Sequence, residues 1–200
     1  MNLLPSFFPL TLRQASRLIE VKKDDVVFRL GNSADSIYRV VSGEIRLIRY
    51  TPGGDEIVLH RAGAGEYFAE GSFGAESYHC TALCSGAGAV LRIPAKLFRV
   101  HLEQDSAFAF AWTMELAGSL RTLRRRFERT NLKSAADRVV HFLITEGMGE
   151  LGQISLSSSL KSWAAEMGMA HETLYRTLND LEAKGIIERN GRTLRLRGNI

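Results

Sequence analysis

Short apolar stretches separated by glycine-containing turns fill the first half of the chain. Turn-forming residues such as Gly31-Asn32, Ser42-Gly43 and the Pro52 to Asp55 segment divide them. Seven runs have the alternation and residue types of strands, at 26–28, 36–41, 44–50, 56–60, 67–68, 80–84 and 90–93. Strands this short and closely spaced favour an antiparallel barrel or jelly roll, whose interior has room for a small ligand.

The apolar period changes to about 3.6 residues after residue 95, and from Ser106 it is that of one long helix. Side chains spaced alternately by four and three residues form a coiled-coil seam at Ala109, Thr113, Leu116, Leu120, Leu123 and Phe127. We expect a homodimer interface at Leu116, Leu120, Leu123 and Phe127. The alternative is a helix that lies on its own β-domain.

The pattern restarts near Ser134, a plausible N-cap for a new helix with an apolar face. This restart predicts three parts, with a β-roll over residues 1–105, a dimerisation helix over 106–132 and a further domain over 133–200. Ser159 can cap a short helix that stops at Gly168, and a second helix of about fourteen residues follows Ala170. Two helices joined by a glycine-containing turn are typical of a helix-turn-helix.

The second of these helices has an apolar face and a polar face. Leu174, Leu178 and Leu181 recur at i, i+4 and i+7, which leaves Glu172, Arg176 and Asn179 opposite, flanked by Thr173 and Tyr175. Arginine pairs with guanine, glutamate accepts from cytosine and asparagine pairs with adenine in the major groove. We expect DNA base readout there, and phosphate contacts from Ser159, Lys161, Ser162 and Thr173.

Residues 186–189 and 193–196 flank an Asn190-Gly191 pair, which is a strong hairpin signal. This hairpin would be the wing of a winged helix. The alternative for the helical pair is a packing unit with no reading function.

Composition narrows the class of protein. The chain of 200 residues is 45% hydrophobic and 24% charged, as is usual for globular proteins, and no apolar run is long enough to span a membrane. We therefore expect a cytoplasmic protein. Residues 1–114 and 134–200 are each charge-balanced, whereas residues 115–133 carry six Lys and Arg against two Asp and Glu. Neither of the two charge-balanced regions therefore has the excess of positive charge that would by itself indicate nucleic-acid binding.

The two cysteines, Cys80 and Cys84, form neither a Cys-x-x-Cys pair nor a zinc pattern with histidine, so we expect two small buried side chains and no metal site. A cupin-type enzyme is a further alternative for a jelly roll. His60, His79 and their neighbours give no convincing arrangement of two histidines and a carboxylate, so we expect no catalysis.

Motifs along nearly the whole chain resemble one family. The first half carries Phe28-x-x-Gly31, Asp35-Ser36-Ile37-Tyr38-x-Val40-x-Ser42-Gly43-Glu44-Ile45 and Gly65-Glu66-x-Phe68-Ala69-Glu70. The second half carries Ala136-x-Arg138-Val139-x-x-Phe142-Leu143 and Glu172-Thr173-x-x-Arg176-x-Leu178-x-x-Leu181-Glu182-x-x-Gly185-Ile186-Ile187. Together they resemble the family of the cyclic-AMP receptor protein and the fumarate-nitrate reduction regulator (CRP/FNR), which are bacterial transcription regulators.

The resemblance implies an α+β fold, with a cyclic-nucleotide-binding-like jelly roll, a long dimerisation helix and a C-terminal winged helix-turn-helix. It implies double-stranded DNA, a second copy of the chain and RNA polymerase as partners. Glu172 and Arg176 match the pair that reads the inner bases of a palindromic half-site. His171 stands where cyclic-AMP-responsive members have arginine, and Tyr175 stands where other branches have glycine or serine, so we expect a related but altered operator.

The effector site departs further from the family pattern. Glu70 matches the ribose-binding glutamate and is followed by Gly71 and Ser72, but His79-Cys80-Thr81 replaces the Arg-Ser phosphate cradle. A buried cyclic phosphate would lack its charge partner, so cyclic AMP is disfavoured. The cysteine cluster of the iron-sulfur branch is absent, we do not expect haem, and the cofactor or small-molecule effector stays unknown.

Three hypotheses about function are therefore open. The leading one is a transcription regulator that is effector-modulated or, alternatively, constitutive. The second is a ligand-sensing module whose winged helix binds protein. The third is the cupin-type enzyme, for which the histidines give no convincing metal site.

Overall fold

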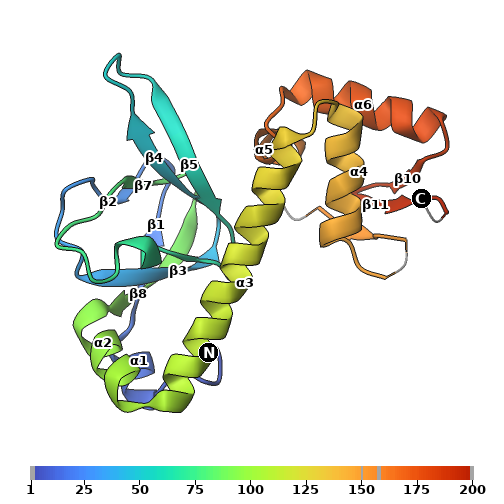
Figure 1. The fold of residues 1–200 in the computed structure, drawn as a ribbon. Helices are drawn as coiled ribbons and strands as arrows, with labels where there is room; N and C mark the ends of the chain where they lie inside the picture. The colour runs from blue at the N-terminus through green and yellow to red at the C-terminus, as the bar shows by residue number, and fades with distance from the viewer. Residues whose placement is uncertain (1–2, 150, 157–158, 199–200) are drawn as a thin grey trace. The chain divides into compact units, whose positions relative to one another are not determined.

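The computed structural model describes residues 3–149, 151–156 and 159–198, and the chain divides into two compact units, Met1–Met114 and Glu115–Ile200 (Figure 1). The boundary between the units falls inside the long helix α3 (Ser106–Asn131). The predicted three-part division stays a prediction.

Two antiparallel four-stranded sheets form the first unit, in the orders β1-β8-β3-β6 and β2-β7-β4-β5. Their strands are β1 (Arg17–Val21), β2 (Val26–Phe28), β3 (Ser36–Ser42), β4 (Ile45–Tyr50), β5 (Glu56–Ala62), β6 (Tyr67–Phe68), β7 (Thr81–Cys84) and β8 (Gly88–Pro94). This sandwich confirms the predicted β-roll. The seven predicted strands are β2 to β8, and β1 was not predicted.

Strand β3 shows how the first unit is held together, because successive side chains of a strand point to opposite faces. Tyr38 and Val40 pack in the core between the sheets, while Ile37 belongs to a second apolar core. The second core joins the outer face of the sheet to Phe98 and Trp112 of the helices. Burial on both faces explains why β3 reads as a nearly continuous apolar run.

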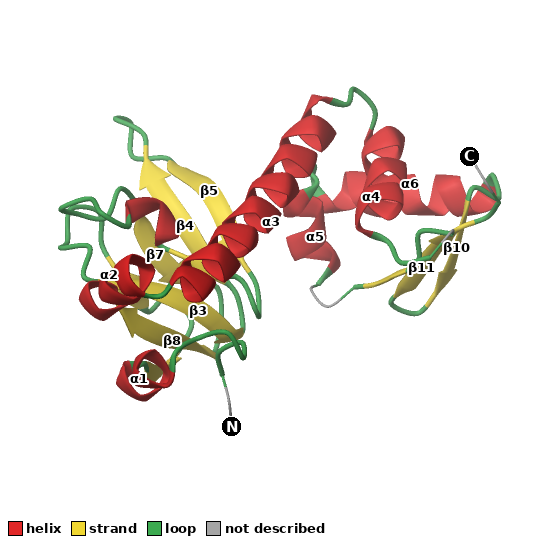
Figure 2. Cartoon of the chain, turned by 60° about the horizontal axis from the view of Figure 1, so that its bottom comes forward, coloured by secondary structure: helices red, strands yellow, loops and turns green. Residues whose placement is uncertain are grey.

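Helices cover the sheet that contains β3 and β8 (Figure 2). They are α1 (Leu10–Ala15), α2 (Ala95–Gln104) and the N-terminal part of α3, and a short 3-10 helix, η1 (Glu70–Ser72), follows β6. Phe98 and Phe108 are fully buried, with ring centroids 5.1 Å apart. The helical period found after residue 95 is therefore confirmed.

Three helices and a small sheet form the second unit beyond α3. They are α4 (Ala135–Glu146), β9 (Ile154–Ser155), α5 (Leu160–Glu166), α6 (His171–Ala183), β10 (Ile187–Asn190) and β11 (Thr193–Leu196), with the sheet in the order β10-β11-β9. The two predicted caps are present, since Ser134 Oγ accepts from the amide of Asp137 at 2.9 Å and Ser159 Oγ accepts from that of Ser162 at 3.1 Å.

The wing differs from the sequence expectation in two details. Asn190 pairs with Thr193, so the two-residue loop of the hairpin is Gly191-Arg192 and not Asn190-Gly191. Gly191 has φ +58°, which a two-residue hairpin loop with glycine first requires. Strand β9 pairs with β11 and was not predicted.

Candidate nucleic-acid interface and effector site

Helix α6 is anchored to its unit by one apolar face. Leu174, Leu178 and Leu181 are buried, and they pack with Trp163 of α5 and Val139 of α4 in one core. Gly168, with φ +64°, ends the preceding helix in the left-handed conformation, so the turn between α5 and α6 takes only a few residues. The structure thus contains the helix-turn-helix expected from the sequence.

The opposite face of α6 is exposed. The side chains of His171, Glu172 and Arg176 form no hydrogen bond or ion pair with any residue in the described parts of the chain. The N-cap residue, Ala170, has no side chain that could accept from the first amides of the helix. The backbone amides at the N-terminus of α6 and the side chains along its first turns are therefore available to a partner.

Two other expected readers, Tyr175 and Asn179, contact the wing. Arg189 of β10 donates to Asn179 Oδ1 at 3.2 Å, and its guanidinium carbon lies 6.0 Å from the centroid of the Tyr175 ring. Glu182 Oε2 is 3.5 Å from Arg189 Nη2. Sequence reasoning missed Arg189, although the alternation of β10 places it on the same side of the sheet as the buried Ile187.

The expected phosphate contacts lie near the start of the helix pair. Ser159 and Lys161 are exposed, whereas Ser162 and Thr173 are partly buried. Ser159 uses its hydroxyl oxygen as a cap acceptor, so its hydroxyl hydrogen is what it can give to a phosphate.

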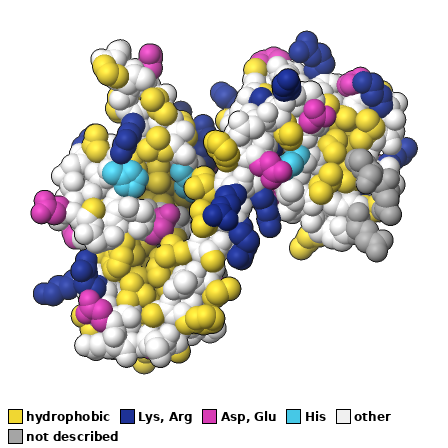
Figure 3. All heavy atoms as spheres, viewed as in Figure 1, with side chains coloured by type: hydrophobic (Ala, Val, Ile, Leu, Met, Phe, Trp, Pro, Cys, Tyr) yellow, Lys and Arg dark blue, Asp and Glu magenta, His cyan; other side chains and the backbone are white. Residues whose placement is uncertain are grey.

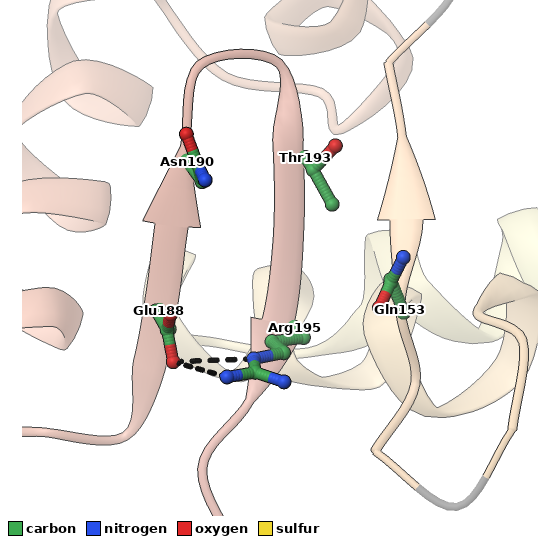
Figure 4. A pocket seen from close by; sticks show the side chains of 5 residues that line it. All are labelled: Gln153, Glu188, Asn190, Thr193 and Arg195. Carbon is green, nitrogen blue, oxygen red and sulfur yellow. Dashed lines mark hydrogen bonds and ion pairs between the residues drawn. The ribbon is translucent and has the colours of Figure 1, made fainter.

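A hollow of about 320 Å³ lies on the outer face of the wing sheet, lined by Gln153, Glu188, Asn190, Thr193 and Arg195 (Figure 4). Arg195 donates to Glu188 Oε2 from Nη2 at 2.7 Å and from Nε at 3.1 Å, and Arg197 is 3.6 Å from the same oxygen. These bonds hold the pKa of Glu188 below its usual value. The carboxylate therefore offsets the wing cations at this face.

The last turns of α3 carry most of the Lys and Arg residues of segment 115–133, and some of these arginines form ion pairs within the second unit. Arg129 is fully buried, lies 3.0 Å from Glu146 Oε1 and has its guanidinium carbon 4.5 Å from the centroid of the Phe142 ring. Arg125 also pairs with Glu146, at 3.3 Å. Arg129 is therefore packed inside the second unit and is not a solvated side chain at a helix end.

The expected dimer seam on α3 is exposed within the single chain. Leu116, Leu120, Leu123 and Phe127 are 39%, 47%, 56% and 71% exposed. Figure 3 shows hydrophobic side chains, with Lys and Arg beside them, at the surface over this helix. An exposed apolar stripe of this length on a helix is typical of a surface that contacts another protein.

The expected effector residues come together at one end of the β-sandwich. Ser72 Oγ is 2.6 Å from His79 Nδ1, and a Cβ on Gly71 would lie 3.3 Å from His79 Cε1. Burial raises the pKa of the Cys80 thiol, and the charge of the nearby Glu70 carboxylate adds to that rise. Thr81 instead accepts from the amide of Leu30 at 3.0 Å, which ties it to a neighbouring loop.

Glu70 is the unusual group of this cluster. Burial raises its pKa, and its Oε2 atom has no hydrogen-bond partner among the residues described. An unpaired buried carboxyl costs stability and is a common mark of a binding site.

A cation that the sequence analysis missed lies beside the same cluster. Arg49 of β4 donates from Nε to the carbonyl of His79 at 2.7 Å, and its charge offsets part of the rise that burial causes in the pKa of the Cys80 thiol. It is thirty residues from His79 in the chain, and only the pairing of β4 with β7 brings it there. The segment of residues 79–81 therefore has a guanidinium next to it.

Both cysteines are buried, as expected, and neither forms a disulfide. Burial raises the pKa of each thiol, that of Cys84 to about 11. We expect a maleimide or aromatic disulfide reagent to label the native protein on the order of 100-fold more slowly than the unfolded protein, since thiolate is the reactive form. Stoichiometric labelling under native conditions at the unfolded rate would show that these thiols are accessible and reactive.

Comparison with known proteins assigns both halves of the chain. A model of the cyclic nucleotide-binding domain matches residues 18–105, and a model of the Crp-like helix-turn-helix domain matches residues 137–197. Together these matches cover more than half of the chain.

Relatives match along most of their length. The CRP-like protein Clp of Xanthomonas campestris pv. campestris is 27% identical over 184 residues, which is 86% of this chain and 80% of Clp. The structure of FixK2 from Bradyrhizobium japonicum has a TM-score of 0.69 at 22% identity, covering 92% of this chain and 93% of FixK2. A structure of the c-di-GMP responsive global regulator CLP from Xanthomonas campestris has a TM-score of 0.54 at 21% identity, covering 93% of this chain and 96% of that one.

Across the described ranges, the helices are all too short or too polar to cross a membrane.

Proposed function

Because the chain belongs to the CRP/FNR family of DNA-binding transcription regulators, we propose that it binds a palindromic operator as a homodimer in the cytoplasm, where it regulates transcription through RNA polymerase. The family is one of regulators and not of enzymes. The observation that carries the proposal is the exposed face of α6, where the side chains of His171, Glu172 and Arg176 form no hydrogen bond or ion pair with the described residues.

In this proposal α6 enters the major groove. Arg176 donates to a guanine and Glu172 accepts from a cytosine, since these are the base edges that match a planar donor pair and a carboxylate. His171 and Tyr175 lie on the same exposed side and replace the residues usual in relatives, so they give this operator its own sequence.

Phosphate contacts fix the register of α6 in the groove. We assign them to Ser159, Lys161, Ser162 and Thr173, together with the uncapped amides at the start of α6. The charge balance over residues 134–200 leaves no broad basic surface, so tight binding has to depend on these local contacts and on two copies of the chain.

The second copy packs along α3. Leu116, Leu120, Leu123 and Phe127 recur at the a and d spacing of a coiled coil and are exposed in the single chain. A symmetric pair of these stripes buries both, and two recognition helices are then available for half-sites about 34 Å apart.

A small-molecule effector binds at Glu70 in this proposal and modulates DNA affinity. The unpaired Glu70 oxygen would accept hydrogen bonds from it, and Arg49 would face an anionic part of it. The sequence disfavoured cyclic nucleotides because their phosphate would lack a charge partner, and Arg49 is a cation that could fill this role. Calorimetric titration with cyclic AMP and with cyclic di-GMP is therefore the first test. Loss of binding in Glu70→Gln would support the site, whereas binding unchanged by Glu70→Gln and Arg49→Gln would place the ligand elsewhere.

The buried carboxyl gives a stability test that needs no ligand. A raised pKa means that the folded state binds more protons than the unfolded state above about pH 4.5, so the free energy of unfolding contributed by Glu70 falls as pH rises through that window. We expect Glu70→Gln to raise the unfolding free energy at pH 7 by about 1.4 kcal/mol for each unit of the pKa shift, and to have little effect near pH 4. Denaturant titrations measure this difference. If the variant and the wild type had the same unfolding free energy at pH 7 as well as at pH 4, the burial of an ionised Glu70 would be contradicted.

Selection of double-stranded DNA from a random pool tests the main proposal. We expect enrichment of an inverted repeat, and a changed yield with effector present. Enrichment of a single unrepeated site would contradict the homodimer. No enrichment at all would favour the alternative that the winged helix binds protein, and enrichment that no cell extract alters would favour a constitutive regulator.

A further inference from the structure

The side chain of Arg189 connects the wing to the recognition helix. Its neighbours in β10, Glu188 and Asn190, face the hollow on the other side of the sheet (Figure 4). Arg189 instead reaches Asn179 at 3.2 Å and Glu182 at 3.5 Å. Tyr175, whose ring it also approaches, precedes these two residues by four and seven positions, so all three lie on one side of α6.

The chemistry of this contact limits what Asn179 presents to a partner. A guanidinium only donates, so the Asn179 atom that faces it has to be the carbonyl oxygen. An asparagine that reads adenine needs both its oxygen and its amide nitrogen along the base edge. Contact with Arg189 turns that oxygen toward the wing and leaves the amide nitrogen as the group that can donate to a base.

The charge of Arg189 is also partly balanced. Glu182 pairs with it, and the Tyr175 ring is at the distance at which a cation and an aromatic face attract. These partners make Arg189 a poor candidate for a free phosphate contact and a good one for fixing its neighbours.

Resting on the proposed function, we propose that Arg189 is a positioning residue that sets operator specificity through Asn179. By engaging the Asn179 carbonyl, it makes this side chain a donor toward phosphate oxygens or toward the acceptor edges of guanine and thymine. The wild-type protein then has no adenine preference at the base pair that Asn179 faces.

Base preference in selected half-sites tests this proposal. Arg189→Met frees the carbonyl, and we expect a new preference for adenine of at least about fivefold at one position of each half-site. Arg189→Lys keeps a donor and is expected to keep the wild-type preference. The double variant Arg189→Met with Asn179→Ala is expected to lose the new preference, because the effect acts through Asn179.

A matched control removes a different wing cation. Arg197 is exposed and pairs only loosely with Glu188, at 3.6 Å, so Arg197→Met is expected to leave every base preference unchanged. Circular dichroism melting confirms that each variant is folded before selection.

Three results would overturn the proposal. The first is an adenine preference already present in the wild type and unchanged in Arg189→Met. The second is equal weakening by Arg189→Met on all sequences with a smaller salt dependence, which is the signature of a phosphate contact. The third is a new preference that survives Asn179→Ala. Failure of the wild type to select any DNA would instead reject the proposed function itself.

Discussion

Substituting Arg176 by alanine is expected to remove most of the discrimination at one base pair of each half-site. Arg176 is exposed on α6 and forms no bond within the described chain that would compete with a base. A bidentate arginine contact to guanine supplies about 1 to 3 kcal/mol of discrimination, and a dimer loses it twice on a palindrome. Affinity for the operator should therefore fall by about 2 to 6 kcal/mol, which titration of labelled operator and single-base variants measures.

Lys184→Ala is the matched control for that experiment. The substitution also removes one positive charge, but Lys184 is the C-cap residue at the far end of α6 and pairs with Asp180 at 2.8 Å. We expect its base preferences to match those of the wild type. If Arg176→Ala kept the same preference at every position, the assignment of the reading face of α6 would be wrong.

Introducing two carboxylates into the exposed apolar stripe of α3 is expected to dissociate the homodimer into monomers. Leu120 and Leu123 are half exposed in the single chain, and a second copy would bury them. In the double variant Leu120→Glu with Leu123→Glu, the dimer would bury unpaired charges, which costs several kcal/mol. We expect a monomer in sedimentation and at least about 100-fold weaker operator binding, because two linked modules gain about 100-fold or more from binding together.

Arg121→Glu is the control for the dimer variant. It places a carboxylate on the same helix, one residue from Leu120 and therefore about 100° around the axis. We expect this variant to sediment as a dimer. If the double variant remained dimeric with unchanged operator binding, the α3 stripe would not be the dimer interface.

Local patterns in the sequence predicted the elements well where the pattern was long. The a and d spacing predicted α3, and the buried faces of α6 followed from Leu174, Leu178 and Leu181. Strand β1 was missed because four of its five residues are exposed, so neither of its faces carries a clean alternation. The hairpin was found but displaced by one residue, because an Asn-Gly pair fits two turn registers.

The site was predicted less completely, since side chains that meet across long stretches of chain leave no local signal. Arg49 reaches His79 through strand pairing, and Arg189 reaches Asn179 through the packing of wing on helix. Asn179 itself was expected as an adenine reader from its place on α6 alone. Only the contact with β10 showed that its carbonyl is engaged.

The central claim is that a homodimer binds a palindrome with its two recognition helices. The spacing between the half-sites tests it most directly, because both half-sites have to lie on one face of the DNA. Operator affinity should be measured for the selected palindrome and for the same palindrome with five base pairs inserted at its centre, which turns one half-site by about half a helical turn. We predict that the insertion lowers the affinity to that of a single half-site. Equal affinity for the two DNAs would contradict binding by a homodimer to two half-sites.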